Sequence, residues 1–231
     1  MAVLAGCSTA TETKDGKPID PLIVSMYAPV PGEPFRIPAV PVSKVDSQYF
    51  RQTVATPGHI PNEPGVIVVD PYSHFLYLVQ DDGQSLRYGI GVGRQGFSWS
   101  GTAEVHDKQH WPKWFPPKEM QERDRFAARF PNGMNGGPRN PLGSRALYLW
   151  KDNKDTLYRI HATNEPLSIG KSVSSGCIRM WNQDVMDLYE RVPLGTKVVV
   201  LDGPGTQPLD APLAPGAPAV ASAAPIPEDA G

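Results

Sequence analysis

The sequence predicts a mainly β domain with minor α, arranged as a β-sandwich or a β-barrel-like sheet. Three observations support this fold class: short apolar runs bounded by Pro and Gly, two pairs of segments with β-hairpin signals, and one clear amphipathic helix late in the chain. At 231 residues, the chain has room for one domain plus flanking segments. We therefore expect a central domain over residues 56–202, between two ends of different composition.

Two apolar runs predict strands in the interior of this domain. Residues 66–69 read Val-Ile-Val-Val and follow Pro64-Gly65, and residues 197–201 are almost entirely β-branched or leucine. Runs of this length, flanked by turn residues, are typical of buried strands. The second run is expected to be the last strand of the domain.

Two hairpins are predicted from segment pairs that enclose turn residues. Residues 75–80 and 85–92 flank an Asp-Asp-Gly-Gln turn, and residues 146–150 and 156–161 flank a Lys-Asp-Asn-Lys-Asp turn. His161 then stands at the end of a strand, where a side chain is held rigidly.

The clear helix is predicted over residues 182–192. Asn182 is expected to cap it, Asp184 suits its positive N-terminal end, and apolar residues recur at helical spacing until Pro193 ends it. Residues 111–143, rich in Trp, Pro, Gly and Asn, predict a loop-rich insertion with a weaker helix over 118–130.

The two ends of the chain differ from the middle because proline is concentrated in them. Residues 1–55 are interpreted as a truncated signal or leader followed by a Pro-rich spacer. An arm packed along the domain is the alternative for Tyr49-Phe50-Arg51. Residues 203–231 form an Ala/Pro-rich tail that cannot bury enough surface to offset the entropy of ordering, so it is expected to be disordered.

The first residues end in Leu-Ala-Gly-Cys at positions 4–7, which looks like the lipobox of bacterial lipoproteins. The stretch lacks a basic segment and its apolar part is short. Either the natural start lies upstream of Met1 or the match is a coincidence in a run of small residues. The first alternative predicts a lipid attached to Cys7.

Charge and cysteine content exclude several classes of protein. The net charge of −2 leaves no basic footprint, so nucleic acid is not an expected partner. No apolar run approaches the roughly 18 residues that span a bilayer, so a lipid at Cys7 is the expected membrane attachment. Two cysteines are too few for a disulfide scaffold, and Cys177 is expected to remain a thiol.

One histidine and one cysteine carry the chemistry suggested by the sequence. Cys177 follows Gly176, sixteen positions after His161. A thiol has a pKa of about 8.5 and is a weak nucleophile until a base helps it to ionise. A neighbouring imidazole can take that proton, and backbone N–H groups at a Gly-Cys turn can stabilise charge on a carbonyl oxygen. The alternatives are a small buried cysteine and a histidine hydrogen-bonded at a strand end.

The segment Ser174-Ser175-Gly176-Cys177-Ile178-Arg179 resembles the active-site motif of the L,D-transpeptidase catalytic domain (YkuD type) of bacterial cell-wall enzymes. The resemblance covers about residues 60–202. It includes four upstream segments in the same order: Ile67-Val68-Val69-Asp70, Leu76-Tyr77-Leu78, residues 88–94 and residues 137–143.

The resemblance implies a mixed sheet folded into a β-sandwich cradle, with Cys177 as nucleophile and His161 as general base and later acid. Ala162 stands where the family usually has Gly or Ser, and its backbone carbonyl would orient the imidazole. Ser175 replaces the second histidine of the commoner motif. Backbone N–H groups of Cys177 and Gly176, with Ser175 as a further donor, would form the oxyanion hole.

Further residues are candidate substrate contacts, each with a structural alternative. Arg179 is expected to grip a stem-peptide carboxylate or to form a structural ion pair. Asn164 and Ser174 are substrate contacts or turn formers. The tryptophans expected in a peptide groove or in the core are Trp111, Trp114 and Trp150. His106 and His110 lack a third ligand, so no metal site and no cofactor are predicted.

These residues together predict a peptidoglycan L,D-transpeptidase that is exported to the periplasm or cell envelope. Cys177 would attack a tetrapeptide stem, release D-alanine, and pass the acyl group to an amine in a 3→3 cross-link. With water as acceptor the same acyl-enzyme is an L,D-carboxypeptidase, and with an outer-membrane protein amine it is an anchoring enzyme. A non-catalytic wall-binding module is the alternative from another class. A papain-like protease is disfavoured because no papain-like Cys signature occurs.

Overall fold

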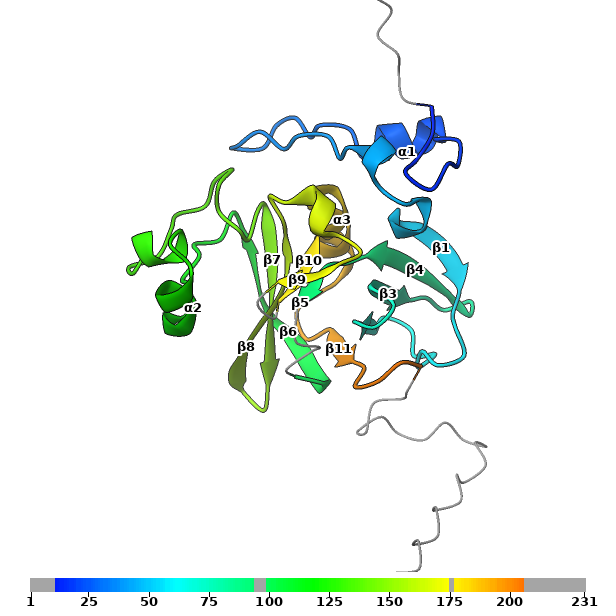
Figure 1. Ribbon diagram of the computed structural model, residues 1–231. Helices are drawn as coiled ribbons and strands as arrows, with labels where there is room; N and C mark the ends of the chain where they lie inside the picture. The colour runs from blue at the N-terminus through cyan, green and yellow to red at the C-terminus, as the bar shows by residue number, and fades with distance from the viewer. Residues whose placement is uncertain (1–10, 94–98, 175–176, 206–231) are drawn as a thin grey trace, which may run out of the picture.

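The structure is a computed structural model that describes residues 11–93, 99–174 and 177–205 (Figure 1). The leader residues 1–10, including Cys7, and the tail from residue 206 lie outside this description. The helices are α1 (Pro21–Met26), η1 (Val42–Lys44), η2 (Ser47–Tyr49), α2 (Lys118–Arg123), η3 (Ala127–Arg129), η4 (Pro166–Ser168) and α3 (Asn182–Arg191). The strands are β1 (Gln52–Ala55), β2 (Ile67–Asp70), β3 (Phe75–Val79), β4 (Gln84–Gly89), β5 (Val92–Gly93), β6 (Gly101–His110), β7 (Arg145–Lys151), β8 (Lys154–Ala162), β9 (Ser172–Ser174), β10 (Ile178–Met180) and β11 (Lys197–Val200).

Nine of the described strands form one mixed sheet in the order β1-β4-β3-β2-β11-β6-β7-β8-β10. The β11–β2 and β10–β8 pairs are parallel, and the other neighbours are antiparallel. The remaining pair, β5 and β9, forms a small parallel sheet. The predicted fold class, mainly β with mixed strands and few helices, is confirmed.

The sheet curls so that its two halves share one core. Gly91, just beyond β4, bridges to Arg179 of β10, with each N–H donating to the other carbonyl at 2.9 and 2.8 Å. This bridge joins the second strand in the sheet order to the last. One continuous cluster of buried side chains accordingly draws on both halves, from Leu76 and Tyr88 to Leu147, Ile160 and Ile178. Apolar side chains on alternate positions of β2, β3, β4, β6, β7, β8, β10 and β11 therefore fill one interior.

Both predicted hairpins and both predicted buried strands are present. Strand β2 is buried at every position, and β3 pairs with β4 across the Asp-Asp-Gly-Gln turn. Strands β7 and β8 meet at Asp152 and Asn153, which both have positive φ. This is the backbone of a two-residue hairpin turn, which Asn and Asp tolerate.

Helix α3 ends as expected but begins differently. Trp181 occupies the N-cap without a side-chain hydrogen bond, so the expected cap at Asn182 is wrong. The Asn182 amide instead bridges two loops: its Oδ1 accepts from the Ser144 N–H and its Nδ2 donates to the Thr163 carbonyl, each at 3.1 Å. Tertiary partners thus replace the local cap.

The insertion over residues 111–143 stands at the side of the sheet and carries α2 (Figure 1). The helix expected over 118–130 is split into α2 and the single turn η3. Trp114, Ala127 and Leu142 form a small core of its own. The long strand β6, which leads into this insertion, was not predicted because its alternation of apolar and polar residues is weak.

Residues 11–50 pack against the domain, which differs from the extended spacer expected for them. This N-terminal arm crosses the domain near α3 (Figure 1). Its Tyr27, Val40, Val45 and Phe50 form a buried cluster with Ile169 and Trp181. Packing of Phe50 agrees with the alternative of an arm along the domain. Proline makes the arm stiff, and its aromatic and β-branched side chains supply the buried surface.

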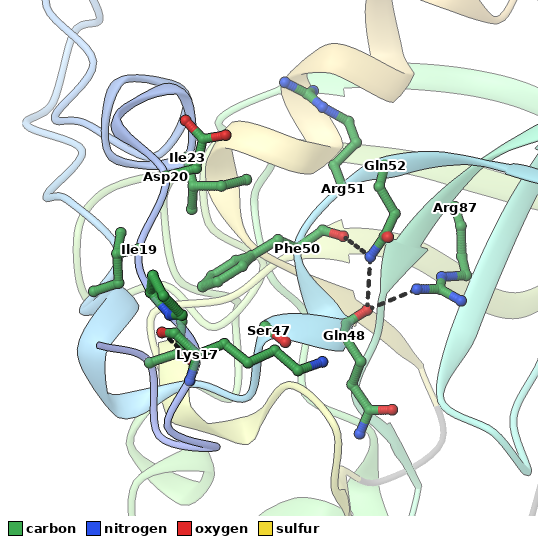
Figure 2. A pocket seen from close by; sticks show the side chains of 12 residues that line it. Lys17, Ile19, Asp20, Ile23, Ser47, Gln48, Phe50, Arg51, Gln52 and Arg87 are labelled. Carbon is green, nitrogen blue, oxygen red and sulfur yellow. Dashed lines mark hydrogen bonds between the residues drawn. The ribbon is translucent and has the colours of Figure 1, made fainter. Parts of the chain in front are cut away.

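The arm also encloses a hollow of about 330 Å³ against β4 (Figure 2). The Gln48 carbonyl accepts hydrogen bonds there from Gln52 at 3.3 Å and from Arg87 at 3.1 Å.

Among the described residues, no helix has the length and apolarity needed to cross a bilayer.

Candidate active site

The two candidate catalytic residues come from neighbouring strands. In the parallel β8–β10 pair, Ile178 lies opposite Ile160 and Arg179 opposite His161. Cys177 immediately precedes β10, which brings it level with Arg159. Because side chains alternate between faces along a strand, Cys177 and His161 belong to the same face and to diagonal positions. Strand spacing and rise imply a Cα separation of about 8 Å for such a diagonal pair.

His161 is held in one tautomer by the backbone. Its side chain is buried, and Nδ1 lies 2.5 Å from the Ala162 carbonyl oxygen. A carbonyl only accepts hydrogen bonds, so Nδ1 carries the proton and Nε2 has a lone pair. Burial lowers the pKa of His161 to about 4 against the opposing effect of that hydrogen bond. At neutral pH the imidazole is therefore uncharged and able to accept a proton.

Cys177 is a half-buried thiol. Its Sγ lies 4.0 Å from the Leu157 carbonyl oxygen, at the outer limit for a sulfur hydrogen bond. Burial raises the pKa of the Cys177 thiol, while the Arg159 backbone N–H and the Arg159 and Arg179 charges act in the opposite direction. The thiol is thus protonated at rest, beside groups that favour its ionised form.

A bulge in β8 faces this sulfur. The β7–β8 register shifts between Tyr148 and Trp150, and Leu157 adopts a φ of +63° although it is not glycine. Asp155 and Arg159 close the bulge through two hydrogen bonds of 2.7 Å. A non-glycine residue with positive φ is uncommon and costs backbone energy. The sequence contained no signal for this bulge, which brings Arg159 to the site.

Arg179 is engaged by a residue that sequence reasoning did not select. Its Nη1 donates to Glu165 Oε2 at 2.6 Å, and Glu165 is 65 % exposed. An exposed ion pair contributes at most about 1 kcal/mol, so a competing carboxylate can displace Glu165.

The remaining predicted site residues have different surroundings. Ala162 supplies the carbonyl that orients His161. The Asn164 amide is exposed and donates to the Arg139 carbonyl at 3.3 Å. Ser174 ends β9, whereas Ser175 and Gly176 lie outside the described residues.

The three tryptophans suggested for a groove have other surroundings. Trp111 donates to Glu33 at 2.7 Å, Trp114 lies in the core of the insertion, and Trp150 stacks on His106 at 3.9 Å. Within the ranges that the structure describes, no three His, Cys, Asp or Glu side chains are grouped as metal ligands.

The loops behind His161 are held tightly. Gly143 has a φ of +61°, and a Cβ added there would lie 2.5 Å from the Ala162 Cβ. Asn182 links both loops through its hydrogen bonds to Ser144 and Thr163. The carbonyl that orients the imidazole is therefore fixed by packing from two sides.

The sequence identifies the family of this chain. The model of the L,D-transpeptidase catalytic domain (YkuD) matches residues 64–200, and the chain belongs to this family. It is 34% identical over 145 residues to the probable L,D-transpeptidase YbiS of Escherichia coli K12, covering 61% of this chain and 45% of that protein. It is 46% identical over 147 residues to the putative L,D-transpeptidase YqjB of Bacillus subtilis 168, covering 62% and 74% of the two chains.

The chain spans less than half the length of the E. coli relatives. A solved structure described as a probable carnitine operon oxidoreductase from Brucella melitensis is 54% identical. The match covers 68% of this chain and 96% of that one, with a TM-score of 0.47.

Proposed function

We propose that this protein is a peptidoglycan L,D-transpeptidase that works through an acyl-enzyme on Cys177. Family membership over residues 64–200 carries the proposal. The register of β8 and β10 supports it, because it puts Cys177, just before β10, diagonal to His161 of β8, and a base must lie near its nucleophile.

The first half-reaction transfers the stem to the enzyme. The Cys177 sulfur attacks the carbonyl at the L-centre of the diamino acid in a tetrapeptide stem, while its proton passes to His161 Nε2. The tetrahedral intermediate then collapses: the C–N bond to the terminal D-alanine breaks, and His161 returns the proton to the leaving amine. Backbone N–H groups at residues 175–177 would donate hydrogen bonds to the carbonyl oxygen and so stabilise its negative charge.

The second half-reaction resolves the thioester. An acceptor amine attacks the thioester carbonyl and loses a proton to His161, the C–S bond breaks, and Cys177 regains its proton. The product with a stem amine is a 3→3 cross-link. Water and an outer-membrane protein amine are the other acceptors, and all three share the same acyl-enzyme.

The electrostatics favour a neutral resting pair. His161 is uncharged at pH 7 because its pKa is about 4, and the Cys177 thiol has a raised pKa. Proton transfer therefore accompanies attack, and the Arg159 and Arg179 charges stabilise the sulfur as it ionises.

Peptidoglycan lies outside the cytoplasmic membrane, so the proposal requires export to the periplasm or envelope. Its partners there are peptidoglycan stem peptides. A lipid on Cys7 would keep the protein at the membrane, which metabolic labelling with a fatty-acid analogue would test.

Acylation by a carbapenem tests the chemistry directly, because its strained cyclic amide opens on attack by a thiolate. Intact-mass spectrometry should show one adduct on the wild type and none on Cys177→Ala. An unchanged wild-type mass, or an adduct that survives Cys177→Ala, would contradict the assignment.

Incubation with a disaccharide-tetrapeptide separates the enzyme from a wall-binding module. Release of D-alanine is expected, with an acceptor amine increasing the yield of cross-linked product. Binding without release would favour the module, and release without cross-linking the carboxypeptidase.

A further inference from the structure

A groove of about 460 Å³ lies between the N-terminal arm and the segment that leads to Cys177. Pro41 and Lys44 form its wall on the arm. The opposite wall consists of Glu165, Pro166, Leu167, Ser168, Lys171 and Val173. A hollow of this size can hold a small peptide or ligand fragment. The family match over residues 64–200 includes only the second wall, and the first wall belongs to the N-terminal arm.

The walls offer apolar surface to a ligand. Leu167 and Val173 are 43% and 37% exposed, and Pro41 and Pro166 lie beside them. Leucine and valine side chains gain free energy when a ligand covers them. Small apolar side chains of a peptide suit such a surface.

Two lysines place unneutralised positive charge on the groove. Lys44 and Lys171 are exposed, and among the described residues neither has a carboxylate within 4.0 Å. Lys14 and Lys197, in contrast, each hold a carboxylate at 2.9 Å. The one acidic side chain of the groove, Glu165, is turned to Arg179.

The groove reaches the candidate active site at Glu165. This residue binds Arg179, which pairs with His161 across β8 and β10. A ligand carboxylate that replaced Glu165 on Arg179 would free the 65% exposed Glu165 side chain to turn toward solvent. A peptide whose carbonyl lay at Cys177 could therefore continue past Arg179 toward Lys44.

We propose that this groove binds the acidic part of the stem peptide, with its carboxylates toward Lys44 and Lys171 and its apolar side chains on Leu167 and Val173. The N-terminal arm thereby completes the substrate site by contributing a cation. This inference rests on the proposed function for the identity of the peptide, but the binding itself requires no turnover.

The test measures binding of a fluorescein-labelled tetrapeptide stem by anisotropy at low salt. Lys44→Gln and Lys171→Gln should each raise Kd about threefold, and the double variant about tenfold, because exposed charge pairs are individually weak. Lys118→Gln, an exposed lysine of α2, is the matched control and should bind as the wild type does. A tetrapeptide with its glutamyl carboxylate amidated should bind weakly and show less dependence on the two lysines.

The outcomes separate this groove from the proposed reaction. Unchanged binding in the double variant, or an equal loss in Lys118→Gln, would overturn the groove even if the wild type releases D-alanine. Lysine-dependent binding by a protein that releases no D-alanine would support the groove and refute the transpeptidase. In an active enzyme, the double variant should raise KM by a larger factor than it lowers kcat.

Discussion

The hydrogen bond from His161 Nδ1 to the Ala162 carbonyl would let the proposed active site orient its imidazole without a carboxylate partner. A backbone acceptor sets the tautomer whatever the side chain at position 162, provided that the side chain is small. Ala162 is fully buried and faces Gly143, so space for its methyl group is limited. Ala162, whose carbonyl accepts from His161, and Gly143, which leaves room for the Ala162 methyl group, therefore pack as one unit.

The reactivity of Cys177 should rise steadily with pH. Because the thiol pKa is raised and His161 is neutral above about pH 4, the free protein holds no thiolate–imidazolium pair. The rate of alkylation by iodoacetamide should therefore increase about tenfold per pH unit from pH 6 to 8. A high plateau below pH 7 would indicate a preformed ion pair instead.

Gly143→Ala should destabilise the protein by about 2 kcal/mol or more, because the left-handed backbone and a Cβ contact at 2.5 Å both oppose it. Gly195→Ala is the matched control: its φ is +81°, but a Cβ there meets nothing within 4 Å, so about 1 kcal/mol is expected. Urea unfolding measures both. An equal loss of stability in the two variants would mean that the added Cβ at position 143 makes no costly contact with Ala162.

At the scale of elements, α3 and the N-terminal arm are joined by a buried polar cluster. Tyr27 Oη donates toward Asp184 at 3.0 Å and accepts from the Arg51 N–H at 2.7 Å, and Arg51 lies 2.8 Å from Asp187. Burial raises the pKa of Asp184 to about 7 although Arg51 and Tyr27 oppose the shift. The arm is therefore attached through a carboxyl group that stays protonated in weak acid.

Asp184→Asn should flatten the pH dependence of stability. The native carboxyl keeps its proton up to about pH 7, whereas the unfolded one loses it near pH 4, so the free energy of unfolding of the wild type falls as pH rises through this window. The variant cannot ionise and should lack this fall of a few kcal/mol in urea unfolding at pH 4.5 and 7.5. The exposed Asp81→Asn control should follow the wild type; a parallel fall in Asp184→Asn would contradict the assignment.

At the scale of the whole molecule, the arm belongs to the folded domain. Glu33 binds Arg145 of β7 through hydrogen bonds of 2.6 and 3.1 Å, and the Tyr27 cluster covers Trp181. Arg145 is only 4% exposed, so removing Glu33 would leave a buried charge. These contacts connect residues more than 100 positions apart.

Deletion of residues 1–46 should lower stability by several kcal/mol, because it exposes Trp181 and leaves Arg145 and Asp184 without their arm partners. A lower urea midpoint and a red-shifted tryptophan emission are expected. An unchanged urea midpoint would mean that the arm contributes nothing to the stability of the domain.

These contacts also show where prediction from sequence ends. Strand β2 and the β3–β4 hairpin were predictable because their signals are local: apolar runs and turn residues. Strand β6 was missed because its exposed and buried positions do not alternate cleanly.

Contacts between residues far apart in the sequence could not be predicted either. His161 and Cys177 were selected by a motif, but Glu165 on Arg179, the Arg159 bulge and Lys44 beside the groove depend on pairings that no local pattern encodes. Likewise, the proline content of the arm predicted stiffness and could not reveal the surface on which it packs.

The most direct test of the central claim is intact-mass spectrometry of the protein mixed with a tetrapeptide stem, followed by peptide mapping. The wild type should carry the tripeptide acyl group on Cys177 with one D-alanine released per adduct, and His161→Gln should form it at least a hundredfold more slowly. A tripeptide adduct on another residue, or equal rates in wild type and His161→Gln, would contradict a thiol at 177 served by the imidazole at 161.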